Sequence, residues 1–106
     1  MLIPIVRDGV ETRCEQRLKR IRTVLAVLTD HQRLKILLAL TAAEELCVGE
    51  VAHALGTSVS LASHHLRKLR DLGILEDRSE GKLAYDFLRQ RYVARIAVTA
   101  LAVAEA

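Results

Sequence analysis

Apolar residues recur at helical spacing along the first half of the chain. Positions three and four residues apart predict an amphipathic helix from Cys14 to Leu28, with Leu18, Ile21 and Leu25 on its apolar side. A second helix follows in "DHQRLKILLALT", with Thr29 or Asp30 as its N-cap. Because this segment is apolar on most of its surface, we expect a buried helix. Its expected core residues are Leu34, Ile36, Leu37, Leu38 and Leu40.

A tight turn between two short helices comes next. The segment "LCVGEVAHAL" predicts a helix that ends at Gly56, and Thr57 and Ser58 supply the N-cap of the following helix. That helix has an apolar stripe and a separate polar side. The stripe holds Val59, Ala62, Leu66 and Leu69, and the polar side holds Ser60, Ser63, His64 and Arg67. Hydroxyls, an imidazole and a guanidinium suit phosphates and base edges in a major groove, and a merely solvated surface is the alternative.

The two adjacent histidines of this helix do not form one site. Neighbouring side chains in a helix point about 100° apart, so His64 and His65 cannot easily share a metal ion. His64 lies with the polar residues. His65 lies on the flank of the apolar stripe, where we expect it to be packed or hydrogen-bonded within the protein.

The segment after Gly73 predicts a β-hairpin. Two short apolar runs surround "SEG", and Gly81 supplies the turn of a hairpin over residues 74–88. A hairpin after the helix-turn-helix is a wing. Arg78 and Lys82 flank its tip, within reach of phosphates or a minor groove, although such charges are also common without any function. The last segment, "RYVARIAVTALAVAEA", is apolar on more than one face. We expect a second copy of the chain to bury this surface in a dimer.

Length and composition limit the choice of protein class. The 106 residues are enough for one domain with a small core, and we expect an arm over residues 1–13 and a single domain over residues 14–106. A net charge of +3 permits nucleic acid as a partner without demanding it. No apolar run is long enough to span a membrane and no secretory signal is present, so we expect a cytoplasmic protein. The sequence has no glycine-rich phosphate loop, nucleophile elbow or Cys–His motif, so we do not expect an enzyme.

The stretch "ELCVGEVAHALGTSVSLASHHLRKLRDLGILEDRSEGKLAYDFL" resembles the winged-helix core of the ArsR/SmtB metalloregulatory repressors. The resemblance covers residues 30–88 closely. It implies a mainly α fold with a small β-hairpin wing, and a homodimer that represses transcription from a pseudo-palindromic operator until an inducer binds. It also implies that residues 59–71 enter successive major grooves. The implied DNA contacts are Ser58, Val59, Ser60, Ser63, His64 and Arg67, with Arg78 and Lys82 on the wing.

The resemblance also points to an inducer site. One family site uses Asp and His pairs on the final helix, and this chain has no His there and no Asp after residue 86. The other resembles that of the cadmium and lead sensors, which combine cysteines of the arm with a Cys-Val-Cys motif. Here the motif is Cys47-Val48-Gly49, and Cys14 is the arm cysteine. The resemblance therefore implies a soft metal or metalloid ion on Cys14 and Cys47 as inducer, not needed for folding.

The identity of the ion depends on further ligands. Two thiolates suffice for linear mercury, whereas cadmium, zinc, lead or arsenite needs another ligand. The candidates for that ligand are Asp8, Glu11, Glu44, Glu45 and His53.

Three alternatives remain open for these features. Cys47 is also interpretable as a small buried hydrophobic residue and Cys14 as an incidental one. Two free thiols brought together would instead sense oxidants by closing a disulfide. Winged helices also serve as protein-interaction modules, and such a module would show no salt-dependent binding to duplex DNA.

Overall fold

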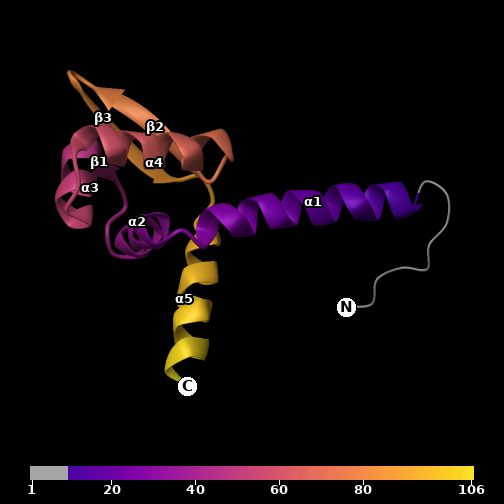
Figure 1. The fold of residues 1–106 in the computed structure, drawn as a ribbon. Helices are drawn as coiled ribbons and strands as arrows, with labels where there is room; N and C mark the ends of the chain where they lie inside the picture. Colours follow the sequence, from indigo (N-terminus) through magenta and orange to yellow (C-terminus); the bar gives the residue numbers. More distant parts are fainter. Residues whose placement is uncertain (1–9) are drawn as a thin grey trace.

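The computed structural model describes residues 10–106, which form five helices and one small antiparallel sheet (Figure 1). The fold is mainly α with a β-hairpin wing, as the sequence predicted. In chain order the elements are α1 (Val10–Leu28), α2 (His31–Ala42), β1 (Leu46–Cys47), α3 (Val48–Leu55), α4 (Val59–Asp71), β2 (Leu75–Glu80), β3 (Leu83–Leu88) and α5 (Val93–Glu105). Helix α1 begins four residues earlier than predicted, so residues 10–13 of the expected arm are helical.

Local signals set the helix boundaries. Asp30 is the N-cap of α2, and its carboxylate accepts hydrogen bonds from the backbone N–H groups of Gln32 and Arg33 at 2.9 and 3.1 Å. The hydrogen bond from Arg33 is the main reason that the pKa of Asp30 is lowered. Gly56 ends α3 with φ +65°, a left-handed conformation that glycine adopts without strain. The predicted turn between α3 and α4 is thereby confirmed.

The core lies between α2, α3, α4 and the sheet. Its buried apolar residues are Leu28, Ile36, Leu37, Leu40, Val51, Ala52, Leu55, Ala62, Leu66, Leu69, Ile74, Leu75, Leu88, Ala94 and Ala97. The prediction that Leu38 is buried is wrong, because α2 turns only one side toward its neighbours and Leu38 lies on the other side. Leu34 is partly exposed.

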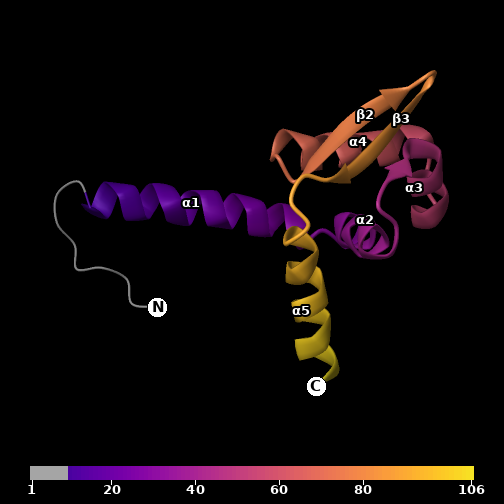
Figure 2. The same cartoon turned by 180° about the vertical axis from the view of Figure 1, so that it is seen from behind.

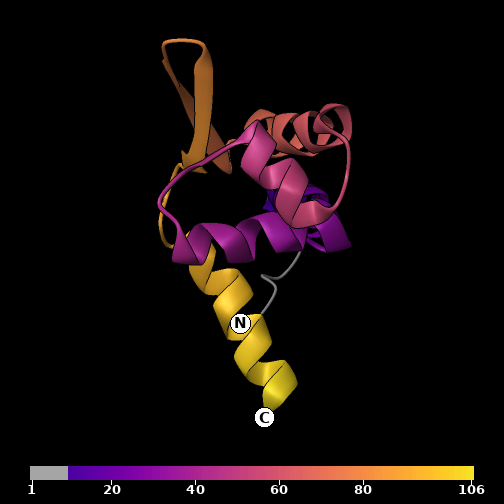
Figure 3. The same ribbon diagram turned by 90° about the vertical axis from the view of Figure 1, so that its left-hand side faces the viewer.

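The sheet has the strand order β1-β3-β2. Strands β2 and β3 form the predicted hairpin, with Leu75 opposite Leu88 and Glu80 opposite Leu83, and Gly81 turns the chain at φ +61°. Strand β1 was predicted as the start of a helix. Its two residues pair with β3 instead, Leu46 opposite Asp86 and Cys47 opposite Tyr85. The hairpin projects beside α4 as a wing (Figure 3).

Helices α1 and α5 project from this core in different directions (Figures 1 and 2). Helix α5 buries Ala94 and Ala97 but leaves large apolar side chains exposed, as the sequence predicted for the last segment. The exposed apolar residues of the two helices are Leu18, Ile21, Leu25, Ile96, Val98, Leu101 and Val103. An apolar groove of about 310 Å³ lies between α1, α2 and α5. None of the helices from Val10 onward has the length and hydropathy of a membrane span.

Candidate nucleic-acid interface and cysteine site

Helix α4 separates its buried and exposed sides in nearly the way the sequence predicted. Ala62, Leu66 and Leu69 are buried against the core. Val59 lies on the same stripe by its angular position, but it is 53% exposed in the first turn of α4. Ser58 is the N-cap and its hydroxyl accepts a hydrogen bond of 3.1 Å from the backbone N–H of Leu61.

The expected DNA-contacting side of α4 is open to solvent. Ser60, His64 and Arg67 are exposed, and Ser63 is half-buried. No acidic residue lies on α4 before Asp71. The surface therefore offers hydroxyl, imidazole and guanidinium groups without a nearby carboxylate of its own helix, which suits the phosphates and base edges of a duplex.

His65 has a different environment from His64. It is 7% exposed, and its Nδ1 has no hydrogen-bond partner among residues 10–106. Burial lowers the pKa of His65, and the positive charge of Arg33 lowers it further. The two imidazole rings lie 6.1 Å apart and tilted. The prediction that His65 is packed inside the protein is confirmed.

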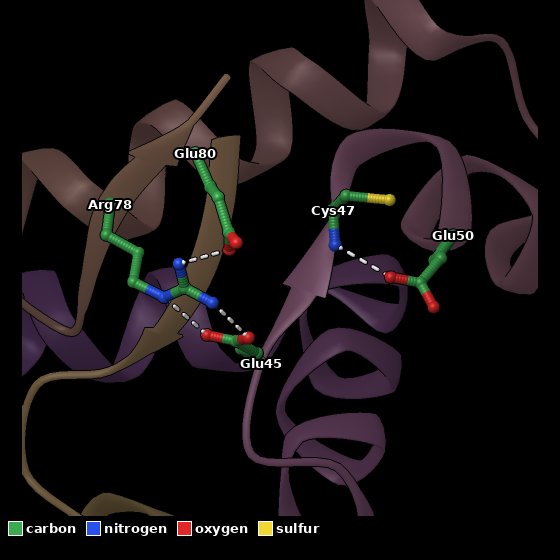
Figure 4. A network of polar contacts seen from close by, with 5 residues as sticks. All are labelled: Glu45, Cys47, Glu50, Arg78 and Glu80. Atoms are coloured by element: carbon green, nitrogen blue, oxygen red, sulfur yellow. Dashed lines mark hydrogen bonds and ion pairs between the residues drawn. The ribbon is translucent and has the colours of Figure 1, made fainter. Parts of the chain in front are cut away.

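The two basic residues of the wing, Arg78 and Lys82, differ in whether they form ion pairs within residues 10–106. Arg78 donates to Glu45 Oε2 and to Glu80 Oε2, both at 2.9 Å (Figure 4). Its guanidinium carbon lies 4.8 Å from the centre of the Tyr85 ring. The hydrogen bonds to these carboxylates raise the pKa of Arg78. Lys82 follows Gly81 at the turn, is exposed and forms no ion pair within residues 10–106.

Cys47 lies at the junction of β1 and α3, not inside a helix. Its backbone N–H donates a 3.0 Å hydrogen bond to Glu50 Oε1, and this bond is the main cause of the lowered pKa of Glu50. The thiol is half-buried and free. Its sulfur points away from the cluster of Glu45, Arg78 and Glu80 (Figure 4).

Cys14 is far from Cys47 in the protomer. It lies in the second turn of α1, in the half of the helix that extends farthest from the core, whereas β1 lies beyond α2 on the other side of the molecule (Figures 1 and 2). It too is a half-buried free thiol. A single protomer therefore does not bring the two predicted ligands together.

The candidate additional ligands do not complete a metal site within the protomer. Among the described residues, no group of three His, Cys, Asp or Glu side chains is arranged to hold a metal ion. Glu44 and His53 are exposed, and Glu45 is bound to Arg78. Asp8 lies outside the described residues, and the side chain of Glu11 is also outside them.

A groove of about 460 Å³ lies between the start of α3, helix α4 and the wing. Its lining includes Cys47, Ser63, Lys82 and both members of an ion pair, Arg70 and Asp86. The groove thus places the Cys47 segment next to residues expected to contact DNA.

The ion pair between Arg70 and Asp86 was not predicted from the sequence. Arg70 Nη1 donates to Asp86 Oδ1 at 2.7 Å, and Asp86 is only 3% exposed. Burial raises the pKa of Asp86, and the hydrogen bond from Arg70 opposes that rise. The available signal was an acid in the middle of the apolar strand "LAYDFL", since a buried carboxylate requires a partner.

Comparison with known proteins gives consistent matches. Residues 30–77 match the model of the bacterial regulatory protein arsR family. The cadmium resistance transcriptional regulatory protein CadC of Listeria innocua is 43% identical over 63 residues, 59% of this chain and 53% of the relative. The arsenical resistance operon repressor of Escherichia coli is 45% identical over 56 residues, 53% of this chain and 48% of that protein. The matches thus span about half the length of these curated relatives.

A solved structure matches more of the chain. The homodimeric winged helix-turn-helix DNA-binding domain Mb0332 of Mycobacterium bovis, a possible ArsR-family transcriptional regulator, is 31% identical with a TM-score of 0.76. The match covers 88% of this chain and 85% of that one, so it extends beyond the part matched by the curated relatives.

Proposed function

Because the chain belongs to the ArsR family of bacterial regulatory proteins, as its sequence resemblance predicted, we propose that it is a homodimeric repressor that leaves its operator when a soft metal or metalloid ion binds. The family consists of transcriptional regulators, in agreement with the prediction that the chain is not an enzyme. The observation that carries the proposal is the exposed polar side of α4 beside the wing. A repressor of this kind works in the cytoplasm, where its operator is.

In this proposal α4 is the recognition helix. Ser60, Ser63, His64 and Arg67 face base edges and phosphates in the major groove, and the exposed Val59 offers an apolar contact to a thymine methyl group. Ser58 contributes at the start of the helix through its backbone, since its hydroxyl caps α4. On the wing, Lys82 has no ion-pair partner among residues 10–106 and is the cation that we propose for the phosphate backbone. Arg78 acts there only if it leaves Glu45.

The homodimer is supported by the exposed apolar sides of α1 and α5. These helices leave large side chains such as Ile21 and Leu101 uncovered. A symmetric dimer would bury the same apolar surfaces twice and would place two copies of α4 on successive major grooves.

Duplex binding is the first test of the proposal. A duplex selected from a random pool by the purified protein serves as operator, and the salt dependence of its Kd is measured. We expect binding that weakens steeply with salt and a preference for palindromic sequence. A protein that selects no sequence and shows no salt-dependent binding is a protein-interaction module instead.

We place the inducer on Cys14 of one protomer and Cys47 of its partner. Soft ions prefer thiolate ligands. Relatives of this chain are regulators of cadmium and arsenical resistance, which supports ions of this class without selecting one. The projection of α1 away from its own β1 supports a site between protomers. Two thiolates fit a linear ion such as Hg²⁺, and a further ligand is needed for Cd²⁺, Pb²⁺, Zn²⁺ or arsenite.

The cysteine variants test this site. Reduced protein bound to the selected duplex is titrated with Cd²⁺, Pb²⁺, Zn²⁺, Hg²⁺ and arsenite, with thiolate absorption as a second signal. We expect Cys47→Ser and Cys14→Ser to bind the duplex like the parent and to remain bound when the ion is added. Variants that still release the duplex show that the sensing site lies elsewhere. Release by peroxide, reversed by a reductant and not caused by any ion, indicates the disulfide mechanism instead.

Mixing the two serine variants decides which protomers share a site. A mixed dimer of Cys14→Ser and Cys47→Ser keeps one complete pair of thiols if each site joins two protomers, and none if each site lies within one. We therefore expect mixing to restore about half of the parent's metal binding in those molecules that are mixed dimers.

A further inference from the structure

We propose that the ion pair between Arg70 and Asp86 is the link through which a change at Cys47 reaches the recognition helix α4. The proposal rests on the proposed function, because it concerns how an ion on Cys47 weakens DNA binding. Arg70 and Asp86 are positioning residues here, and neither is assigned a contact with the ion or with a base.

The sheet connects Cys47 to Asp86. Strand β1 has only two residues, and both pair with β3: Leu46 lies opposite Asp86 and Cys47 opposite Tyr85. Because paired strands are joined by backbone hydrogen bonds, a displacement of Cys47 by a bound ion moves the neighbouring part of β3. Asp86 is the charged residue of β3 in that register.

The ion pair connects Asp86 to α4. Arg70 lies in the last turn of α4, which packs mainly against α3, β2 and α2. Its 2.7 Å bond to Asp86 is the one side-chain hydrogen bond that joins α4 to the sheet within residues 10–106. A buried carboxylate that loses its counter-charge is costly, so the two residues are expected to move together. A shift of β3 at Asp86 therefore displaces the end of α4.

The groove beside the wing brings the same groups together in space. Cys47, Arg70 and Asp86 all line it, together with Ser63 of α4 and Lys82 of the wing. The sensing thiol, the coupling pair and two proposed DNA contacts therefore surround one space of about 460 Å³. A change at the thiol does not need to cross the core to reach the DNA-binding surface.

The test compares Asp86→Asn with a matched control. Asp86→Asn keeps the size of the side chain and removes its charge. Glu76→Gln removes one charge from the exposed ion pair between β2 and Arg89, which follows β3. The Kd for the selected duplex is measured with and without Cd²⁺, Hg²⁺ or arsenite as probe. The ratio of the two Kd values is compared between proteins, so that a change in basal affinity cancels. We expect a ratio of roughly 5 to 150 for the parent and Glu76→Gln, and less than about 2 for Asp86→Asn.

A second measurement separates positioning from a merely structural role. Ion binding, followed by thiolate absorption, should persist in Asp86→Asn, but duplex DNA should no longer weaken it, because coupling between two sites is reciprocal. Arg70→Lys keeps the positive charge and should retain part of the ratio, whereas Arg70→Gln should lose it. If Asp86→Asn does not fold, the two Arg70 variants make the same comparison.

Hydrogen exchange in the parent protein requires no substitution. Addition of the ion should change amide protection around Asp86 and in the last turn of α4 together. A change confined to α3, or a parent-like Kd ratio in folded Asp86→Asn or Arg70→Gln, overturns this proposal and leaves the proposed function intact. A parent protein that keeps the duplex with all three probes overturns both.

Discussion

His65 is a buried histidine on the inner side of α4, and its burial makes stability depend on pH. Its pKa is lowered mainly by burial, so the folded protein holds a neutral imidazole at a pH where the unfolded chain already binds a proton. As pH falls from about 7.5 to about 5.5, through the ordinary pKa of histidine, the unfolded state gains protons first. We expect the free energy of unfolding to decrease over this range, and to decrease less in His65→Leu, as measured by urea unfolding.

The control for this residue is another buried position of the same helix. Leu69→Met changes packing without a titrating group, so it should shift stability by the same amount at every pH. An equal pH dependence in His65→Leu and the parent would show that His65 is not the source.

At the scale of the element, α4 and the wing are expected to contribute to DNA binding in different ways. Replacing Arg67 by Ala should cost about 1–3 kcal/mol for the selected duplex and relax its sequence preference, because a base-edge contact is lost. Lys82→Ala should weaken binding to all duplexes and reduce the salt slope by about one, because a phosphate contact is lost. Both are measured as Kd values over a range of salt concentrations.

Two further variants serve as a control and as a stricter test of this prediction. Lys35→Ala removes an exposed lysine of α2, which lies on the other side of the core from the wing, and should leave the Kd unchanged (Figure 3). A triple alanine variant of Ser63, His64 and Arg67 with parent-like affinity would place the DNA-binding surface elsewhere.

At the scale of the whole molecule, the protomer is more extended than a compact domain. Its radius of gyration is 16.3 Å, against about 13 Å expected for its length. The excess follows from α1 and α5, which project with exposed apolar sides (Figure 2). Leu101 is 45% exposed on α5. We therefore expect Leu101→Asp to convert the proposed dimer to monomer in sedimentation, because a charge would enter an apolar interface.

Leu83→Asp is the matched control for the dimer. Leu83 is 53% exposed on the wing, away from α1 and α5, so the same substitution there should leave the dimer intact. Dissociation by both variants, or by neither, would contradict an interface built from α1 and α5.

Much of the fold was predictable because its signals are local. The end of α3 at Gly56, the cap at Ser58 and the hairpin turn at Gly81 each depend on a few consecutive residues. The buried side of α4 was predictable because Ala62, Leu66 and Leu69 repeat at the helical period. The same period predicted the exposed side that we propose contacts DNA.

Contacts between residues far apart in the chain were decided by the tertiary structure and were not predicted from the sequence. Strand β1 forms because Leu46 and Cys47 pair with β3. Two residues are too few to show the alternation that predicts a strand. Arg78 binds Glu45, which is 33 positions away in the sequence, and Arg70 binds Asp86, which is 16 positions away. No local sequence pattern predicts either ion pair. The separation of Cys14 from Cys47 likewise follows from the direction in which α1 leaves the core. Local sequence thus determined which sides of the helices are apolar and which are polar. Packing decided which distant residues are in contact, including the route from Cys47 through β3 and Asp86 to α4, because spacing along the chain does not encode distance in space.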